Sequence, residues 1–237
     1  MTVEDTEAGT VIQPSTESNG VILYVHGAPE GGHERATALR LAELTGASVV
    51  CPSYRSMFPV AFEDVRAAYR RCKPAGPVSL VGERMGAGLA AALLVYLRDL
   101  GASLPRCAVL VSGLLDLTMR ANSLMLNARA EPTLDVTQIK QLVSDYAGAA
   151  TLTNPLLSPL YANLHGLAPV QILVGGADPL LDDSLAFAAR AARSGVLVDL
   201  RVWPDTTGLD AVAATAMADF IVANRVSSTP SARLMAG

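Results

Sequence analysis

Six short apolar segments, separated by segments with helical spacing, constrain the fold of this chain most strongly. They are 21–25, 48–51, 78–81, 106–112, 170–174 and 196–203. The first reads Val-Ile-Leu-Tyr-Val, a pattern typical of a strand buried on both faces of a parallel sheet. Successive β-α-β units connect such strands in a right-handed sense. We therefore predict an α/β fold with a doubly wound, mostly parallel sheet and with any functional site at the carboxyl ends of its strands.

The alternation of strands and helices continues to the last strand without an obvious linker, so we predict a single domain, 1–237. The strand rhythm is lost only between 114 and 167. Two segments there, 117–128 and 136–147, have the apolar spacing of amphipathic helices. The stretch 114–167 is therefore predicted to be a helical cap inserted into the domain.

The two ends of the chain are predicted to be flexible, over 1–9 and 226–237, with a short edge strand at 10–13. The acidic first ten residues contain no basic region followed by an apolar one, so no secretory signal is predicted. We expect a cytoplasmic protein.

Composition excludes several classes of partner. The net charge is −4 and no run of Lys or Arg stands out, so neither nucleic acid nor an anionic membrane surface is an expected partner. The few cysteines and histidines form neither a disulfide framework nor a zinc pattern, and no metal or cofactor is expected. These residues are Cys51, Cys72, Cys107, His26, His33 and His165. A covalent role for Cys51 is less favoured than that of a buried strand cysteine.

A glycine-rich turn connects the strand 78–81 to a long Ala/Leu-rich helix, 85–100. Gly82 and Gly86 have the spacing of a G-x-S-x-G nucleophile elbow, in which a strained turn displays the central residue. The central residue here is Arg84. A guanidinium is always protonated, so Arg84 can be neither a nucleophile nor a base.

Several ordered motifs resemble the α/β-hydrolase fold, and specifically the hormone-sensitive-lipase-like esterases. His26-Gly27-Ala28 stands where that family has HGGG, and 82–90 is similar to GDSAGGGLA. The closest match is Gly175-Gly176-Ala177-Asp178 with the residues that follow it. Further similar segments are 53–55, 61–64, 112–118 and 154–161. The resemblance implies an α/β-hydrolase fold with a cap.

The same resemblance implies a catalytic triad, from which this chain departs. The acid is retained as Asp178, and the serine is replaced by Arg84. The position expected for the histidine falls at or beside Gly208, and no His follows position 165. Pro29, where the family has the third glycine of HGGG, lacks the N–H that would help form an oxyanion hole. An extended Arg84 side chain is long enough to fill the space of the missing groups and to pair with Asp178.

We predict a site built on Arg84, Asp178, Glu30 and His33 as catalytic candidates. The last two could transfer a proton, although a loop carboxylate and a helix-start histidine are the simpler descriptions. The predicted ligand pocket comprises His26, Gly27, Ala28, Glu83, Met85, Tyr54, Tyr161 and Trp203. His26 is expected mainly to stabilise its loop, Glu83 to orient the turn, and the aromatic residues either to line a ligand site or to pack in the core.

This altered catalytic set predicts a non-hydrolytic, cofactor-independent enzyme that tailors a small natural product by cyclisation, C–C bond formation, addition or isomerisation. The alternative is a ligand-binding or regulatory protein without chemistry, a pseudo-hydrolase. Ordinary serine-esterase activity is not expected. The expected partner is a small molecule, with a second copy of the chain as a homodimer partner.

Overall fold

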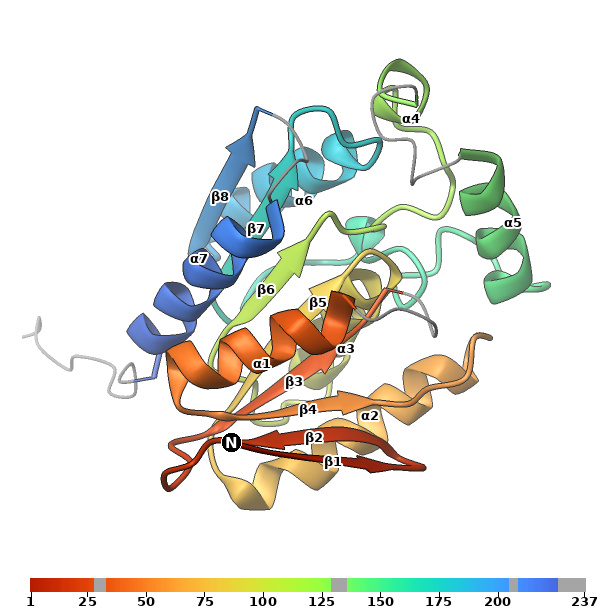
Figure 1. The fold of residues 1–237 in the computed structure, drawn as a ribbon. Coiled ribbons are helices and arrows are strands. Elements are labelled where there is room, and N and C mark those ends of the chain that lie inside the picture. Colours follow the sequence, from red (N-terminus) through yellow and green to blue (C-terminus); the bar gives the residue numbers. More distant parts are fainter. Residues whose placement is uncertain (28–32, 129–135, 205–208, 226–237) are drawn as a thin grey trace, which may run out of the picture.

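The computed structural model describes residues 1–27, 33–128, 136–204 and 209–225, which form a twisted sheet between two layers of helices (Figure 1). The sheet has eight strands in the order β1-β2-β4-β3-β5-β6-β7-β8. The strands are β1 Thr2–Thr6, β2 Gly9–Gln13, β3 Val21–Val25, β4 Ser48–Pro52, β5 Val78–Glu83, β6 Ala108–Val111, β7 Val170–Gly175 and β8 Val198–Trp203. All neighbours from β4 to β8 run parallel, which confirms the predicted α/β fold.

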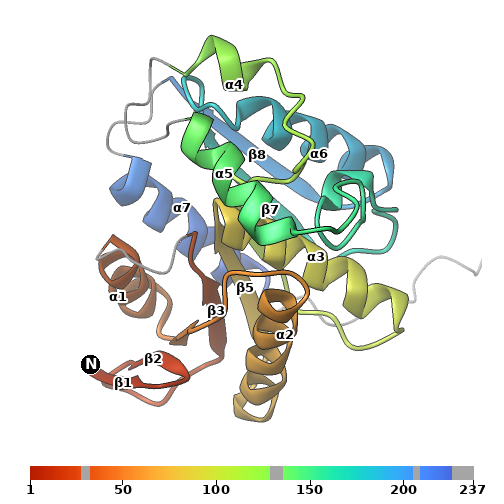
Figure 2. The ribbon, with the colours of Figure 1, turned by 90° about the vertical axis from the view of Figure 1, so that its right-hand side faces the viewer.

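Helices cover both faces of the sheet. They are α1 His33–Thr45, α2 Val60–Cys72, α3 Met85–Asp99, α4 Ser123–Leu126, α5 Val136–Ala147, α6 Leu181–Arg193 and α7 Leu209–Ala223, with short 3₁₀ turns η1 Lys73–Ala75 and η2 Pro159–Tyr161. In Figure 2, α1 and α7 lie on one side of the sheet and α2, α3 and α6 on the other. Because each face is covered, β3, β5, β6 and β7 have almost wholly buried side chains.

Two apolar clusters form the core, one on each face of the sheet. The larger includes Phe62 of α2, Leu89 and Leu93 of α3 and Phe187 of α6. The smaller joins α1 and α7 to the opposite face of the central strands. Helix α3 is buried along nearly its whole length, as its Ala/Leu-rich sequence predicts.

The prediction of a flexible segment at 1–9 is wrong. Residues Thr2–Thr6 form β1, which pairs antiparallel with β2, and β2 in turn pairs antiparallel with β4. The strand at 10–13 is therefore internal rather than at the edge. All five β1 side chains are exposed, so no apolar pattern marks the strand, and backbone hydrogen bonds to β2 hold it in place.

The cap connects β6 to β7 and lies over the carboxyl ends of the strands, where Figure 2 shows α4 and α5. Helix α5 has the predicted bounds, but the helix expected over 117–128 is reduced to α4, Ser123–Leu126. The physical reason lies in the middle of the segment. Met119 has a positive φ of 56°, and Ser123 N, which a helix over 117–128 would pair with residue 119, instead donates to Asp182 Oδ2 at 2.9 Å.

Candidate active site

The turn between β5 and α3 places Arg84 at the carboxyl end of the central strand. Arg84 has φ 51° and ψ −115°, a backbone conformation that costs energy for a residue with a side chain. Its N–H donates to Val111 O at 3.0 Å, and its C=O accepts from Leu114 N at 3.0 Å. Val111 is the last residue of β6, and Leu114 lies in the loop that follows it. Hydrogen bonds from the adjacent strand and its loop therefore stabilise the strained turn. The turn has the conformation of a nucleophile elbow, with an arginine at its centre.

The glycines beside Arg84 are required by close packing. A Cβ added to Gly86 would lie 2.0 Å from Val25 O, and one added to Gly82 would lie 2.5 Å from Gly86 O. In the loop after β3, a Cβ on Gly27 would lie 2.8 Å from Arg84 Cβ. Only glycine lets the end of β3, the turn and the first turn of α3 approach this closely. The arginine is therefore held against the loop that follows β3.

The predicted pair between Arg84 and Asp178 is present. Arg84 Nη1 donates to Asp178 Oδ2 at 3.0 Å and to Oδ1 at 3.2 Å. The Asp178 side chain is fully buried, whereas that of Arg84 is 34% exposed. Asp178 Oδ1 also accepts from Leu180 N at 2.8 Å, so its orientation is fixed by its own loop. Among the described residues, Arg84 Nε and Nη2 have no hydrogen-bond acceptor, and they remain able to bind one.

His26 and Tyr54 connect the two loops that follow β3 and β4. Their rings stack at 4.7 Å, and Tyr54 Oη donates to His26 O at 2.6 Å. His26 Nε2 lies 3.1 Å from Pro52 O, a geometry in which this nitrogen carries the proton. The contacts join the ends of β3 and β4, in keeping with the loop-stabilising role expected for His26.

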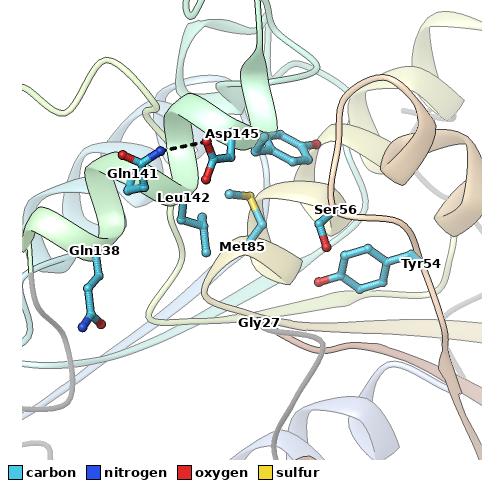
Figure 3. Close-up of a pocket in the computed structure, with 9 residues that line it drawn as sticks. Gly27, Tyr54, Ser56, Met85, Gln138, Gln141, Leu142 and Asp145 are labelled. Atoms are coloured by element: carbon cyan, nitrogen blue, oxygen red, sulfur yellow. Dashed lines mark hydrogen bonds between the residues drawn. The ribbon is translucent and has the colours of Figure 1, made fainter.

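A cavity of about 420 Å³ lies between the elbow and α5 (Figure 3). Met85 rises from the start of α3 toward Leu142 and Asp145 of α5, and Tyr54 and Ser56 lie on the far side. Its described lining residues are Gly27, Tyr54, Ser56, Met85, Gln138, Gln141, Leu142, Asp145 and Tyr146. The volume is within the range of small-molecule sites.

Three of the predicted pocket residues line this cavity, namely Gly27, Tyr54 and Met85. Tyr161 instead donates to Asp116 Oδ2 at 3.2 Å, and Trp203 packs against the α1 and α7 side of the sheet. Glu83 and His26 are also absent from the lining. The predicted residues Ala28 and Glu30 lie outside the described residues, as does the side chain of His33 at the start of α1.

Sequence reasoning missed the contribution of α5. Gln138, Gln141, Leu142 and Asp145 line the cavity together with Tyr146, a spacing that puts them on one side of the helix. Their helical periodicity was visible in the sequence, but the direction in which α5 faces depends on how the cap folds back. Only the three-dimensional arrangement identifies this wall.

A buried carboxylate at the start of α6 binds the cap through hydrogen bonds. Asp183 of α6, 3% exposed, accepts hydrogen bonds from Leu115 N and Asp116 N, both at 2.9 Å. Burial raises the pKa of Asp183 to about 7, and the neighbouring carboxylates of Asp116 and Asp182 act in the same direction. Asp182 Oδ2 also accepts from Ser123 N at 2.9 Å. The start of α6 thus binds the first segment of the cap, next to the loop that carries Asp178.

Within the described residues, no group of three or more His, Cys, Asp or Glu side chains could hold a metal ion, and no helix is long and apolar enough to cross a membrane. All three cysteines are free thiols. Burial raises the pKa of Cys72 and of Cys107 to about 11, which makes both poor nucleophiles. The expected homodimer and cytoplasmic location stay predictions.

Comparison with known proteins places this geometry in context. Residues 23–207 match a family model described as alpha/beta hydrolase fold. An acetyl-hydrolase of Streptomyces hygroscopicus is 34% identical over 209 residues, which cover 82% of this chain and 69% of the relative. An esterase of Acinetobacter venetianus is 26% identical over 208 residues, or 82% and 69% of the two chains. The crystal structure of an esterase from the bacterial hormone-sensitive lipase family aligns with a TM-score of 0.83 and 31% identity, covering 92% of this chain and 81% of that one.

These relatives overturn the predicted function. The prediction of a non-hydrolytic cyclase or isomerase in natural product biosynthesis is wrong, as is the pseudo-hydrolase alternative, because the similar proteins are named acetyl-hydrolase and esterase and point to a hydrolase. The expectation that the chain is not an esterase fails for the same reason. It was inferred from a few positions, chiefly 84 and 208, whereas the similarity extends over most of the chain.

Proposed function

Because the chain belongs to the alpha/beta hydrolase fold family, we propose that it hydrolyses small carboxylic esters, with acetyl esters as the first class to test. The proposal rests on one observation above all, the cavity of about 420 Å³ that opens beside the strained turn of Arg84. A relative named acetyl-hydrolase, 34% identical, supports the choice of acyl group. The substrate is then a small molecule with its carbonyl near position 84.

We further propose that the chain lacks the serine and histidine of the family's triad. Arg84 stands at the centre of the elbow, and no histidine follows position 165. Hydrolysis would then proceed without an acyl-enzyme at position 84, with water as the nucleophile. The charged guanidinium suits a different task, because its Nε and Nη2 can donate to the oxygen of the substrate carbonyl.

In this reaction the water oxygen bonds to the carbonyl carbon and the water's proton passes to a base. Negative charge develops on the carbonyl oxygen, where Arg84 would stabilise it. The C–O bond to the alcohol then breaks, and the alcohol leaves with a proton while the acid is released. Glu30 and His33, three and six positions after Gly27 in the chain, are the proposed proton acceptors.

The Arg84–Asp178 pair would keep the guanidinium in one place. Both oxygens of Asp178 accept from Nη1, at 3.0 and 3.2 Å, which anchors one end of the guanidinium and leaves Nε and Nη2 for other acceptors. A donor held in advance costs little reorganisation when charge develops on the substrate. Asp178 is thus proposed as a positioning residue, and Arg84 as the catalytic one.

Initial rates with 4-nitrophenyl acetate test the proposal, with heat-denatured protein as the blank. We expect turnover by the wild type, and a loss in kcat/KM of about 10²–10³ in Arg84→Met, the usual cost of removing one oxyanion donor. Arg201→Met, which removes an arginine from the edge strand β8, is the matched control and should leave kcat/KM unchanged. Glu30→Gln and His33→Ala show which of the two accepts the proton.

Two results would overturn the proposal. Wild-type rates no higher than the blank for a series of acetyl, propionyl and butyryl esters would remove the hydrolase function. Inactivation by a serine-directed phosphonate, mapped to Ser56 in the cavity, would replace water by a serine nucleophile.

A further inference from the structure

The cavity has an uneven distribution of charge. Asp145 is the one described lining residue with a formal charge, since the others are apolar, aromatic, hydroxyl or amide side chains. Figure 3 shows its carboxylate beside Leu142 and above Met85. Gln141 Nε2 donates to Asp145 Oδ1 at 2.8 Å, a contact that orients the carboxylate. Oδ2 has no hydrogen-bond donor within the described part of the chain, so it can accept one from a ligand.

Two arginines next to lining residues in the sequence are already paired with other carboxylates. Arg84 pairs with the buried Asp178, and Arg55 forms a two-pronged pair with Asp64 at 2.7 and 2.8 Å. Lys140 lies on α5 but is not part of the cavity wall. Among the described residues that line the cavity, Asp145 therefore supplies the one charge that a ligand would meet, and it has no cationic partner.

The remaining wall favours a cation with attached carbon atoms. Tyr54 and Tyr146 both line the cavity, and the hydrogen bond from Tyr54 Oη to His26 O fixes its ring. The electron-rich faces of such rings attract ammonium groups, and the thioether of Met85 packs readily against methyl groups. An anionic ligand would gain nothing from these groups and would be repelled by Asp145.

We propose that this cavity selects esters that carry an ammonium group, with Asp145 of α5 as the residue that determines the preference. The inference rests on the proposed function, because it places the ester carbonyl at Arg84 and the ammonium group at the α5 wall. Binding of the ammonium group does not require hydrolysis, so it can be measured with ligands that contain no ester bond.

Calorimetric titration of the whole chain with choline and with its neutral isostere 3,3-dimethylbutan-1-ol measures this preference directly. We expect choline to bind about fivefold to tenfold more tightly, the contribution of one exposed ion pair aided by aromatic contact. Asp145→Asn, which keeps the shape of the side chain, should remove most of the difference, because only the aromatic contact remains. Asp99→Asn removes the same charge from the far end of α3 and should leave the difference intact. Asp145→Lys should reverse the preference, so that the neutral alcohol binds more tightly than choline.

Hydrolysis separates this inference from the proposed function. The ratio of kcat/KM for acetylcholine to that for 3,3-dimethylbutyl acetate should exceed about five in the wild type and fall toward one in Asp145→Asn. If neither ester is hydrolysed, the proposed function fails, and the titration still decides the cation preference. If wild-type protein binds choline no better than the alcohol, or binds neither at millimolar concentration, the inference is wrong even where both esters are hydrolysed.

Discussion

At the scale of single residues, the site depends on one ion pair that joins positions 94 apart in sequence. Arg84 supplies a charge that is one-third exposed, and Asp178 supplies one that is fully buried. A buried carboxylate without a partner is costly, because the protein interior solvates charge poorly. The pair therefore contributes to stability as well as to the chemistry proposed for Arg84.

Replacing Arg84 by Met should lower the free energy of unfolding by about 2 kcal/mol. This is less than the ~3–5 kcal/mol of a fully buried pair, because water reaches the guanidinium. Urea denaturation measures the change. The double variant Arg84→Met/Asp178→Asn should recover most of the loss, since it leaves no unpaired charge. Equal stability of Arg84→Met and wild type would show that solvent already screens Asp178.

At the scale of elements, the elbow works only because β3, β5 and α3 approach one another at glycines. Gly86 tests this packing. A Cβ at this position would lie 2.0 Å from Val25 O, a backbone atom that cannot move aside without distorting β3. Close packing of this kind tolerates almost no added volume.

Gly86→Ala should destabilise the protein by at least about 3 kcal/mol, measured as a lower midpoint of urea denaturation. Gly101→Ala, just past the end of α3, is the matched control. A Cβ there meets nothing within 4 Å, and only the positive φ of 61° opposes it, at a cost of about 1 kcal/mol. Similar losses in the two variants would mean that the elbow adjusts easily.

The junction between α6 and the cap should make stability depend on pH. The folded-state pKa of Asp183, about 7, lies above its ordinary value of 3.8, so the folded protein holds a proton that the unfolded chain releases. The free energy of unfolding should therefore fall as pH rises from about 4 to about 7, by at most about 4 kcal/mol. Denaturation at pH 5 and pH 8 measures this.

Asp183→Asn removes the titrating group and keeps an oxygen that can accept from Leu115 N and Asp116 N. Its stability should change less between pH 5 and pH 8 than that of the wild type. Asp99→Asn, at an exposed carboxylate, should behave like the wild type. A wild type that becomes more stable over the same interval would contradict the assignment.

At the scale of the whole molecule, the central sheet is covered by helices on both faces, whereas the cap helix α5 is packed against the protein on one side only. Strands β3, β5 and β6 are buried on both faces. Helix α5 buries Ile139 and Val143 on one side, whereas its other side lines the cavity. Local opening costs least where few apolar contacts are lost.

Amide hydrogen exchange should consequently be faster in α5 than in β3 and β5. Choline at saturating concentration should slow exchange in α5 and leave the central strands unchanged, because the ligand would bridge the cap and the elbow. Mass spectrometry of peptides from the two regions measures both effects. Equal protection of α5 and the central strands in the free protein would argue against a loosely held cap.

Much of the fold could be predicted from residue patterns. The central strands, the elbow between 82 and 86 and the bounds of α5 follow from continuous apolar runs, glycine spacing and helical periodicity. These signals are local, because strand and helix burial imposes its period on a few neighbouring residues. The exposed strand β1 carries no such period and was missed.

The function was predicted less well than the fold. It was inferred from single positions that differ from the family's catalytic triad, rather than from the similarity of the chain as a whole. Arg84 and Asp178 were recognised as a pair from side-chain length and the expected topology, and the structure contains that pair. The wall supplied by α5 and the fastening of the cap by Asp183 were not recognised. Both join segments whose proximity depends on how the cap folds back.

The sequence by itself determined which central segments become strands, where α5 begins and ends, that the sheet is mostly parallel, and that an arginine stands at the elbow. It could do so because backbone propensity and burial are encoded over short stretches of chain. Only the tertiary structure decided that the cap segment 117–128 is largely non-helical, that Asp183 is buried, and that Asp145 faces the cavity. The reason is physical, since hydrogen bonds and charges between distant segments outweigh the local preferences of each.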